Sequence, residues 1–593
     1  MKFLLTAINA KYIHSNLAVY NLRAYAAHYA KGMADSDTVE IGEYTINNQM
    51  EDILEGIYKA KPDVLMFSCY IWNWKMMQEV ISELHQVRPE LPIWLGGPEV
   101  SYHAEEVLEQ FPFLTGIMVG EGEVTFSELL TFYEKKSSGR YSEQQQLQIV
   151  AFWPGAIKQA GLDSIAGIVY RDPITGELVR TKERSLTNIS EIPFFYKDMK
   201  DFANRIVYYE SSRGCPFRCG YCLSSIDKRV RLRDLTLVKE ELQFFLDQKV
   251  PQVKFVDRTF NCKHDHAMAI WKYINEHDNG VTNFHFEISA DLLREEELQE
   301  MSTMRPGLIQ LEIGVQSANE ITIREINRTM KIDVLSTIVD KIKKGNNVHQ
   351  HLDLIAGLPY EGYESFGKSF DRVYKMNPEQ LQLGFLKVLK GSVMHDRAQE
   401  YGIVYQDRAP YEVLSTKWLT YAEVIRLKQI EEMVEVYYNS GQFCCTMAAL
   451  EQEFASPFCM YECLAAYYDE KNAFAVSHSR IGRYEILYDF IVKTCKERSE
   501  QYMEMLTLDM YLRDNVKKRP EFLRESGVSS DEAAAFYKKE EKERTYLKAY
   551  EGYDRRQMRK MTHLERIDGK TVLFDYKNRD PLTGNAAIYY LSE

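Results

Sequence analysis

The sequence predicts an α/β protein with three parts. These are an N-terminal doubly wound parallel sheet, a central partial barrel of six βα units, and a mostly helical C-terminal domain with a terminal β-hairpin. Short apolar runs alternate with amphipathic stretches up to about Leu130, a second alternation starts near Ile206, and helical periodicity dominates after about Arg408. Strands that alternate with helices are typical of parallel sheets. A chain of 593 residues also exceeds the size of one hydrophobic core.

The domain boundaries are placed where these patterns change. The first domain, the connector, the barrel and the helical domain are expected at 1–140, 141–200, 201–408 and 409–593. Turn residues Asp172-Pro173 and Thr175-Gly176 lie between two strand-like runs and predict a hairpin in the connector. The same signal, Asp580-Pro581 and Thr583-Gly584, predicts the terminal hairpin.

In the first domain, four apolar runs predict strands: KFLLTAIN, VLMFSCY, PIWLGG and GIMVG. Helical periodicity follows them, first over Leu17–Tyr29 and then in WKMMQEVISELHQV, AEEVLEQF and TFSELLTFYEK. The expected strand ends carry Ser68, the pair Gly96-Gly97 and the run Gly120-Glu121-Gly122-Glu123. Glycines at such ends let the backbone approach a ligand closely.

In the central region, six runs predict parallel strands: RIVYYESS, VKFVD, NFHFEISAD, LIQLEIGVQ, HLDLIAG and QLGFLKVL. The intervals between them are long enough for helices. In parallel βα folds, functional residues lie where the strands end.

Composition narrows the class of protein. A formal net charge of −14 argues against a long nucleic acid as the main partner. The start, MKFLLTAINAKYIHSN, is interpreted as a buried first strand without a secretion signal, and no apolar run is long enough for a membrane span. Ten cysteines are too sparse for a disulfide scaffold, so a reducing, cytoplasmic setting is expected.

Three of those cysteines are crowded into RGCPFRCGYCLSS, directly after the first predicted barrel strand. Cys215, Cys219 and Cys222 have the spacing C-x3-C-x2-C, and three thiolates can hold three irons of a 4Fe-4S cluster. The fourth iron would then have no protein ligand and would keep an open coordination position. The alternative is a structural zinc site, which needs a fourth ligand; the next candidates, Cys262 and His264, lie far along the chain.

The segment Arg213 to Ser224 resembles the radical S-adenosylmethionine (SAM) signature, including Tyr221 before the third cysteine. The resemblance extends through the six βα units and implies that SAM chelates the open iron. It also implies a SAM contact at Tyr221, within the signature, and further contacts at successive strand ends: Asp257, Thr259, Glu287, Ser289, Gln316, Ser317, Gly357, Leu358 and Pro359. Taken singly, each polar residue could instead be an ordinary loop or cap residue.

The first domain resembles the cobalamin-binding Rossmann-like domain found ahead of many radical SAM domains, on the segments LGGPEVS and VGEGEVTFSELL. The residues implied in cobalamin binding are Ser68, Gly96, Gly97, Pro98, Gly120, Glu121, Gly122 and Glu123. The alternative is a flavodoxin-like sheet that binds no ligand.

One departure concerns the lower ligand of cobalt. Well-known cobalamin carriers supply a histidine from an Asp-x-His-x-x-Gly loop, whereas here His14 lies in NAKYIHSN without the aspartate or the glycine. We therefore expect cobalamin binding without a protein histidine on cobalt, with His14 as a weaker candidate ligand.

Five cysteines lie in the C-terminal region: Cys444, Cys445, Cys459, Cys463 and Cys495. Cys459 and Cys463 would share one face of a helix. Buried apolar thiols are the simplest interpretation, and an auxiliary cluster or a reactive thiol is the alternative. The region resembles an uncharacterised C-terminal domain of one subgroup of cobalamin-type radical SAM proteins.

The resemblance implies an enzyme whose reduced cluster cleaves SAM and that methylates an unactivated carbon of a small molecule or peptide. A flavodoxin or ferredoxin would supply the electron. The rival hypothesis keeps both cofactors but performs a cyclisation, ring contraction or other rearrangement. A cobalamin or redox sensor without turnover is a third hypothesis, although no helix-turn-helix signal supports DNA binding.

Overall fold

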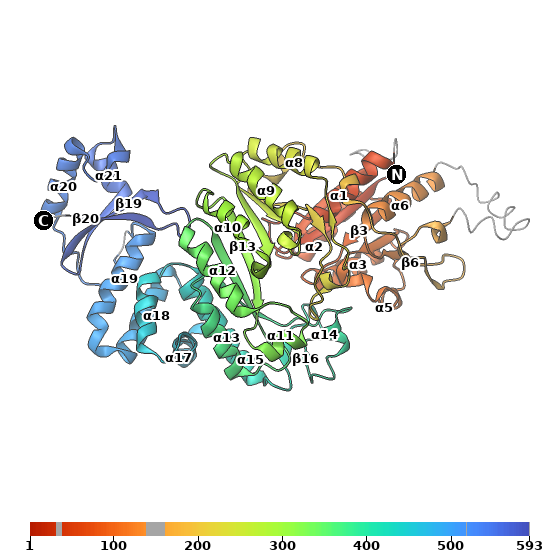
Figure 1. Cartoon of the computed structure of the whole chain (residues 1–593). Helices are drawn as coiled ribbons and strands as arrows, with labels where there is room; N and C mark the ends of the chain where they lie inside the picture. Colours follow the sequence, from red (N-terminus) through yellow and green to blue (C-terminus); the bar gives the residue numbers. More distant parts are fainter. Residues whose placement is uncertain (31–37, 138–160, 517–518, 592–593) are drawn as a thin grey trace, which may run out of the picture. The chain divides into compact units, whose positions relative to one another are not determined.

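The computed structural model describes residues 1–30, 38–137, 161–516 and 519–591 (Figure 1). These residues form two compact units. Unit 1 comprises Met1–Leu292, Ile326–Arg328 and Leu386–Thr416, and unit 2 comprises Leu293–Glu325, Thr329–Phe385 and Lys417–Glu593. The first part of the expected connector, up to residue 160, lies outside the described residues.

A seven-stranded sheet with the order β2-β1-β3-β4-β5-β6-β7 forms the N-terminal part of unit 1. Its strands are β1 (Phe3–Asn9), β2 (Val39–Thr45), β3 (Val64–Ser68), β4 (Ile93–Gly96), β5 (Gly116–Met118), β6 (Ile168–Arg171) and β7 (Leu178–Arg180). The first five are parallel. The hairpin β6–β7 is confirmed, and it adds to the sheet because β6 pairs antiparallel with β5.

Helices follow most strands of this sheet: α1 (Leu17–Tyr29), α2 (Met50–Ala60), α3 (Trp74–Val87), α4 (Pro98–Ser101), α5 (Ala104–Gln110) and α6 (Gly122–Ser137). Every residue of β1 is buried, as expected for the first strand. The parallel order 2-1-3-4-5 places a crevice beyond the carboxyl ends of β1 and β3, where the strand order reverses.

All six strands expected in the central region are present. Unit 1 holds β8 (Val207–Tyr209), β11 (Gln252–Phe255) and β12 (Asn283–Ile288), and unit 2 holds β13 (Ile309–Gln316), β14 (His349–Ala356) and β15 (Gln380–Phe385). Within each unit the three strands are parallel. Their helices are α8 (Leu235–Asp247), α9 (His264–Glu276), α10 (Glu295–Ser302), α11 (Glu320–Glu325), α12 (Ile332–Gly345) and α13 (Tyr363–Tyr374).

These strands present one apolar face and one polar face. In β11, Val253 and Phe255 are fully buried, whereas Lys254 between them is half-buried. Lys254 is in register with Tyr208 on β8 and with His285 on β12, so these three side chains share the polar face. The inner face of a closed, packed barrel is filled by apolar side chains. A polar face therefore suits contact with water or a polar ligand.

Short elements complete unit 1: the pair β9 (Ser212–Arg213) and β10 (Arg231–Leu232), helix α14 (Val393–Asp396), and the pair β16 (Val404–Tyr405) and β17 (Val413–Ser415).

The C-terminal part of unit 2 is mostly helical, as expected. It contains α15 (Tyr421–Val434), α16 (Cys444–Leu450), α17 (Pro457–Glu470), α18 (Arg480–Thr494), α19 (Ser499–Arg513), α20 (Ser530–Glu543) and α21 (Arg555–Met561). The terminal hairpin is confirmed as β19 (Lys570–Arg579) and β20 (Ala586–Tyr590), and β18 (Thr562–Ile567) adds a third antiparallel strand. Tyr437, Tyr461, Tyr484 and Tyr502 are almost fully buried, so tyrosines build the core of these helices.

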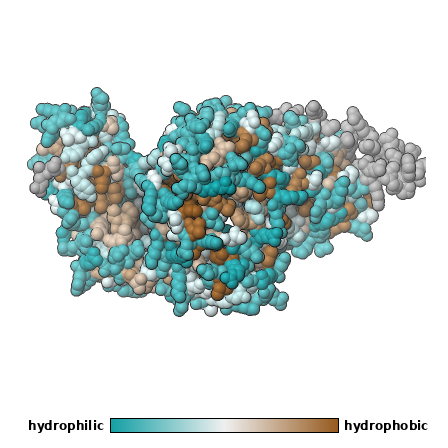
Figure 2. All heavy atoms as spheres, in the orientation of Figure 1, coloured by the Kyte–Doolittle hydropathy of each residue, from teal (hydrophilic) through white to brown (hydrophobic). Residues whose placement is uncertain are grey.

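The surface in Figure 2 is mainly hydrophilic, with hydrophobic residues in small patches. Among the described helices, none combines the length and apolar character that crossing a membrane requires.

Candidate functional site

The three clustered cysteines lie on a loop whose two ends are paired. β9 and β10 are antiparallel, with Arg213 opposite Arg231, and the loop between them carries Cys215, Cys219 and Cys222. Gly214 has φ +97°, and a Cβ at this position would lie 2.4 Å from the carbonyl oxygen of Arg229. A side chain at Gly214 would therefore force the loop apart at its base.

The burial of the thiols and a neighbouring arginine suit an iron–sulfur cluster. Cys215 and Cys219 are each 7% exposed, and Cys222 is half-buried. Nη1 of Arg328 lies 3.8 Å from Sγ of Cys219 and donates to the hydroxyl of Tyr221 at 3.2 Å. Burial raises the pKa of Cys219, and the charge of Arg328 opposes that rise. The guanidinium thus favours the thiolate form that iron requires.

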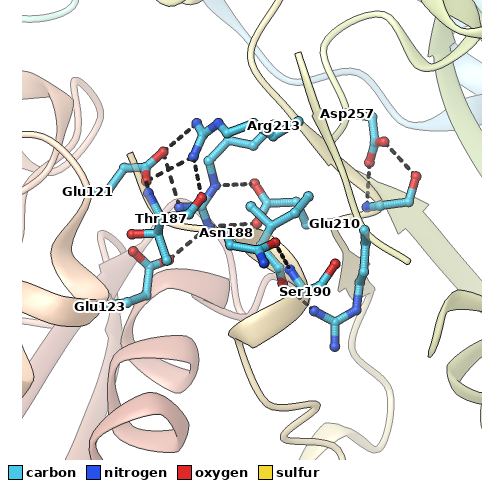
Figure 3. Close-up of polar contacts among 12 residues, drawn as sticks. Glu121, Glu123, Thr187, Asn188, Ser190, Glu210, Arg213 and Asp257 are labelled. Carbon is cyan, nitrogen blue, oxygen red and sulfur yellow. Dashed lines mark hydrogen bonds and ion pairs between the residues drawn. The ribbon is translucent and has the colours of Figure 1, made fainter. Parts of the chain in front are cut away.

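The end of β11 contacts this loop, as the sequence pattern implies. Oγ1 of Thr259 lies 3.6 Å from Sγ of Cys215. Asp257 is fully buried and accepts hydrogen bonds from the amide and hydroxyl of Ser211 and from the hydroxyl of Ser212 (Figure 3). Burial raises the pKa of Asp257 to about 7. Asp257 therefore anchors the chain that leads into the cysteine loop.

Two further candidates for SAM contact lie at the end of β12 in unit 1. The hydroxyl of Ser289 donates to Asp291 at 2.6 Å, and the backbone of Ser289 is bonded to the amide side chain of Asn261. Glu287, two residues earlier on the same strand, is half-buried. The hydroxyl of Ser289 thus already has a partner, whereas its backbone position is fixed by Asn261.

The SAM candidates of unit 2 include a strained residue with an unpaired acceptor. Gln316 ends β13 at a bulge, with φ +73° and 8% exposure. Among the residues that the structure describes, no donor pairs with its buried Oε1. A positive φ and an orphaned buried acceptor are both costly, and both are common at ligand sites. Gln316 therefore fits a SAM contact.

The end of β14 is bonded to the segment after β13. Glu361 is 1% exposed and accepts from the hydroxyls of Ser317, at 2.8 Å, and Ser369, at 2.7 Å. Burial raises the pKa of Glu361 to about 7. Next to it, the segment Gly357-Leu358-Pro359 is fixed by a hydrogen bond from Thr322 to the carbonyl of Pro359. In unit 2, Ser317 and the segment Gly357-Leu358-Pro359 thus belong to one hydrogen-bonded group.

In the N-terminal sheet, the edge between β1 and β3 is polar and closely bonded. The side chain of Asn16 donates to the hydroxyl of Ser68 at 3.3 Å, and that of Asn73 donates to the carbonyls of Ile8 and Ser68. Trp72 also donates to the carbonyl of Ile8. Ser68 therefore lies at the crevice where this strand order binds ligands.

The glycines at the next strand ends differ in their surroundings. A Cβ at Gly97, which has φ +109°, would lie 2.4 Å from the carbonyl oxygen of Cys69, so this glycine is required by packing against the neighbouring loop. A Cβ at Gly96 would lie 3.2 Å from the side chain of Met118. In contrast, a Cβ at Gly120, with φ +82°, would meet nothing within 4 Å. Open space for a ligand thus lies at Gly120, and Pro98 begins α4 beside Gly97.

The acidic residues after β5 bind the base of the cysteine loop (Figure 3). Glu121 accepts from Arg231 at 2.5 and 3.0 Å and lies 3.5 Å from Arg213. Arg213 also donates to Glu123 at 2.8 Å and to Glu210 at 2.7 Å. Burial alone would raise the pKa of Glu121, but the two arginines outweigh it and lower the pKa. Both carboxylates take part in this network, and a Cβ at Gly122 would lie 3.0 Å from the side chain of Leu22.

His14 contacts the polar face of the central strands. Its Nδ1 lies 2.6 Å from the hydroxyl of Tyr208 on β8, and the amide of Ile206 donates to the carbonyl of Ile13. Burial lowers the pKa of His14, assisted by the charges of Lys11 and Lys254. One nitrogen of a neutral imidazole is therefore engaged with a tyrosine. Cobalt ligation by His14 stays a prediction to be tested.

The cysteines of the C-terminal region differ from the expected buried thiols. Cys444 is exposed, and Cys445, Cys459, Cys463 and Cys495 are partly exposed. The expected helix is confirmed, since Cys459 and Cys463 lie one turn apart on α17. Tyrosines fill the core instead, which leaves the thiols at its edges. Cys69 is fully buried, and Cys262 is half-buried.

Sequence reasoning did not single out Arg231, Arg328 or Glu361. Arg328 lies more than a hundred residues after Cys219, which it contacts, so no local spacing indicates it. Glu361 lies only two residues after the candidate Pro359, and a search for acids in the segments that follow strand ends could have found it.

Comparison with protein families gives three consecutive matches. Residues 4–130 match the B12 binding domain, residues 209–373 match the radical SAM superfamily, and residues 399–581 match a protein family of unknown function, DUF4080. These matches confirm the expected order of a cobalamin-binding domain and a radical SAM domain. They also confirm the three expected cofactors, a 4Fe-4S cluster, SAM and cobalamin.

Curated relatives include two methyltransferases and a cyclase. The chain is 23% identical to the cobalamin-dependent radical SAM methyltransferase TokK of Streptomyces tokunonensis, over 60% of this chain and 51% of TokK. It is 24% identical to 2-(S-pantetheinyl)-carbapenam-3-carboxylate methyltransferase of Streptantibioticus cattleyicolor, over 58% of this chain and 49% of that enzyme. It is 22% identical to anaerobic magnesium-protoporphyrin IX monomethyl ester cyclase of Rubrivivax gelatinosus, over 60% and 62%. The chain thus spans about half to three-fifths of the length of these relatives.

Two solved structures share the fold. The radical SAM methyltransferase TsrM of Kitasatospora setae, with cobalamin and a [4Fe-4S] cluster bound, matches with a TM-score of 0.53 at 15% identity, over 70% of this chain and 82% of TsrM. The cobalamin-dependent SAM radical enzyme OxsB, with aqua-cobalamin bound, matches with a TM-score of 0.53 at 14% identity, over 86% and 79%. Together with the cysteine loop, the two family matches show that the chain contains a B12 binding domain followed by a radical SAM domain.

Proposed function

We propose that this enzyme cleaves SAM reductively and transfers a methyl group to an unactivated carbon of its substrate. The observation that carries the proposal is the ion pairing of Glu121 and Glu123, in the B12 binding domain, with Arg213, next to the first cysteine of the cluster loop. Two cofactors can act on one carbon only if both are held close to it. These contacts hold the two cofactor loops together within one compact unit.

The protein's part in this reaction is binding and orientation. When bound, the reduced cluster and SAM supply a 5′-deoxyadenosyl radical that abstracts hydrogen, and cobalamin supplies the methyl group. Cys215, Cys219 and Cys222 would hold the cluster. The proposed SAM contacts are Tyr221, Asp257, Thr259, Glu287, Ser289, Gln316, Ser317 and Gly357 to Pro359, and the proposed cobalamin contacts are Ser68, Gly96 to Pro98 and Gly120 to Glu123.

Glu121 of the cobalamin set is proposed to act through backbone contacts. Its carboxylate is already paired with Arg231 and Arg213, so its main chain is what remains to face a ligand. Glu123 pairs with Arg213 through Oε1, and among the described residues no donor pairs with its buried Oε2. The same reasoning as for Glu121 applies to Asp257, whose carboxylate is bonded to Ser211 and Ser212.

The polar faces of the central strands support a polar substrate, either a small molecule or a peptide. In unit 1, Tyr208, Lys254 and His285 form a row across three strands. In unit 2, Glu312, His351 and Gln380 form a similar row. A TsrM structure holds tryptophan as substrate together with a SAM analog, which agrees with a small polar substrate here.

The electron for SAM cleavage must come from outside the chain. A flavodoxin or ferredoxin is the proposed donor, and a reducing cytoplasmic setting suits both the cluster and the ten cysteines.

A rearrangement without methyl transfer is the second candidate function, and the similarity to a cyclase is the observation that favours it. The two functions leave different products of SAM. The reconstituted enzyme is incubated with SAM, cobalamin, a reductant and extracts of small molecules, and the products are quantified. S-adenosylhomocysteine beside 5′-deoxyadenosine supports methylation. 5′-Deoxyadenosine as the sole product of SAM supports rearrangement and contradicts our proposal.

A further inference from the structure

Two adjacent thiols and a buried carboxylate meet in the C-terminal part of unit 2. Cys444 and Cys445 begin α16, and Asp509 lies on α19. One ligand atom from each of the three residues lies within 4.8 Å of the other two. Sγ of Cys444 is 3.5 Å from Oδ1 of Asp509. No step of SAM cleavage or methyl transfer accounts for this cluster.

Asp509 has a structural role that explains its carboxylate but not the thiols. It is 1% exposed and accepts hydrogen bonds from the amides of Cys445, at 2.9 Å, and Thr446, at 2.8 Å. These bonds cap the first turn of α16, and any residue could supply the two main-chain amides. Oδ1 also accepts a hydrogen bond from the thiol of Cys444, and Oδ2 keeps a second lone pair for another partner. Helix capping therefore explains the carboxylate, but it does not explain why two thiols lie beside it.

We propose that Cys444, Cys445 and Asp509 form a site for a thiophilic divalent cation, with Zn²⁺ as the best fit, that links α16 to α19. In tetrahedral zinc sites, a sulfur and an oxygen ligand lie about 3.6 Å apart, as follows from Zn–S and Zn–O bonds of about 2.3 and 2.1 Å. The observed separation of 3.5 Å between Cys444 and Asp509 matches this geometry. Because Cys444 is exposed, an ion can enter from solvent and water can take the fourth position.

The hydrogen bond at the site is compatible with the same proposal. The thiol of Cys444 donates to Oδ1 of Asp509 at 3.5 Å. A bound cation would take the place of that proton between the sulfur and the oxygen, and it would compensate the buried negative charge of the carboxylate.

The chain offers a matched control pair. Cys459 and Cys463 are also neighbouring thiols, one turn apart on α17. Among the described residues, they do not belong to any group of three close His, Cys, Asp or Glu ligands. A cation that needs the third ligand should therefore distinguish the two pairs.

The test uses the full-length, cluster-loaded enzyme under anaerobic conditions, in which the three cluster thiols are occupied. Iodoacetamide labelling is followed for each cysteine by mass spectrometry, with and without one equivalent of ZnCl₂, and bound zinc is measured after desalting. Zinc should slow the labelling of Cys444 about tenfold or more and leave Cys495 unchanged, with about one zinc retained per chain. Cys459→Ser/Cys463→Ser should behave like the unmodified enzyme.

Two variants separate ligation from folding. Asp509→Asn keeps an oxygen that can cap α16 but removes the anionic ligand, and Cys444→Ser changes an exposed position. Each should lose the bound zinc while the cluster and SAM cleavage are retained. Labelling of Cys444 that zinc does not slow, or zinc retained equally by Cys444→Ser, would overturn the proposal. A Cys444–Cys445 disulfide in the reduced enzyme would overturn it as well.

Discussion

The carboxylate of Glu121 accepts two hydrogen bonds from Arg231, at 2.5 and 3.0 Å, and lies 3.5 Å from Arg213. Arg213 and Arg231 face each other on β9 and β10, at the two ends of the loop that holds the cluster cysteines. One residue of the B12 binding domain therefore binds both ends of the cluster loop. A change at the strand end after β5 can reach the cluster through this contact.

Glu121→Gln should weaken this contact because it removes the negative charge between two arginines. We expect iron content near that of the unmodified enzyme and SAM cleavage reduced about tenfold, since partly buried ion pairs contribute more than surface pairs. The measurements are iron content and 5′-deoxyadenosine release. Glu105→Gln is the control, because Glu105 pairs with Arg180 on the exposed surface of the same domain. Equal activities of the two variants would show that the contact does not position the cluster loop.

The pairing of Glu121 with Arg231 also shows where sequence reasoning ended. Strand ends, the cysteine spacing and both hairpins could be predicted because each depends on residues that are close in the chain. The ion-pair network joins residues about a hundred positions apart, and no local pattern encodes such a pairing.

Two regular elements near the start were also not predicted. β2 and α2 lie between the first two predicted strands. β2 is an edge strand, half-buried along most of VEIGEYT, so it lacks the apolar run that indicated its neighbours. In the same domain, the packing of Gly97 against Cys69 could not be read from the sequence, because a glycine that serves packing and one that serves a ligand look alike.

The cluster loop gives a prediction about iron. Cys215→Ala, Cys219→Ala and Cys222→Ala should each abolish SAM cleavage, because each thiolate holds one of the irons, whereas the unmodified enzyme should carry about four irons per chain. Replacing all five cysteines of the C-terminal region should leave the iron content unchanged. If a variant with all three of these cysteines changed to alanine still formed 5′-deoxyadenosine, the predicted role of the cluster thiolates would be wrong. Loss of about four irons from the five-cysteine variant would reveal an auxiliary cluster.

Glu361 predicts a dependence of stability on pH. Burial raises its pKa from an ordinary value of 4.5 to about 7, so the folded protein favours the protonated form. The stability that Glu361 contributes is thus fully present below about pH 4.5 and is lost as the pH rises to about 7. Relative to Glu361→Gln, which stays neutral, the unmodified protein should lose on the order of 3 kcal/mol over this range.

Thermal unfolding at several pH values between 4.5 and 8 measures this difference. Glu364→Gln serves as the control, because Glu364 is exposed on the same segment of the chain. Parallel curves for the unmodified protein and Glu361→Gln would mean that Glu361 ionises with an ordinary pKa.

The last prediction concerns how cobalamin is held. Gly120 lies at the end of a central strand of the N-terminal sheet, and a Cβ there would point into open space, so a methyl group would conflict with a ligand rather than with the protein. Gly176 is the matched control: it has φ +74°, close to the +82° of Gly120, and a Cβ there also meets nothing within 4 Å, but it lies in the β6–β7 turn. Both alanine variants carry the same backbone strain. Gly120→Ala should therefore reduce cobalamin retention about tenfold or more, and Gly176→Ala should leave it unchanged.

His14→Ala should retain cobalamin as well, since one ring nitrogen of His14 is engaged with Tyr208 and the loop lacks an aspartate to orient the ring toward cobalt. Electron paramagnetic resonance of the cob(II)alamin form checks this independently, because an axial nitrogen splits the cobalt lines and an oxygen ligand or an open position does not. Tyr208→Phe removes the partner of His14 and keeps the ring of the tyrosine, so it reports whether that hydrogen bond holds the histidine away from cobalt. Nitrogen splitting in the unmodified enzyme that disappears in His14→Ala would make His14 the lower ligand. Nitrogen splitting that appears only in Tyr208→Phe would show that His14 can bind cobalt and that its hydrogen bond with Tyr208 prevents it from doing so.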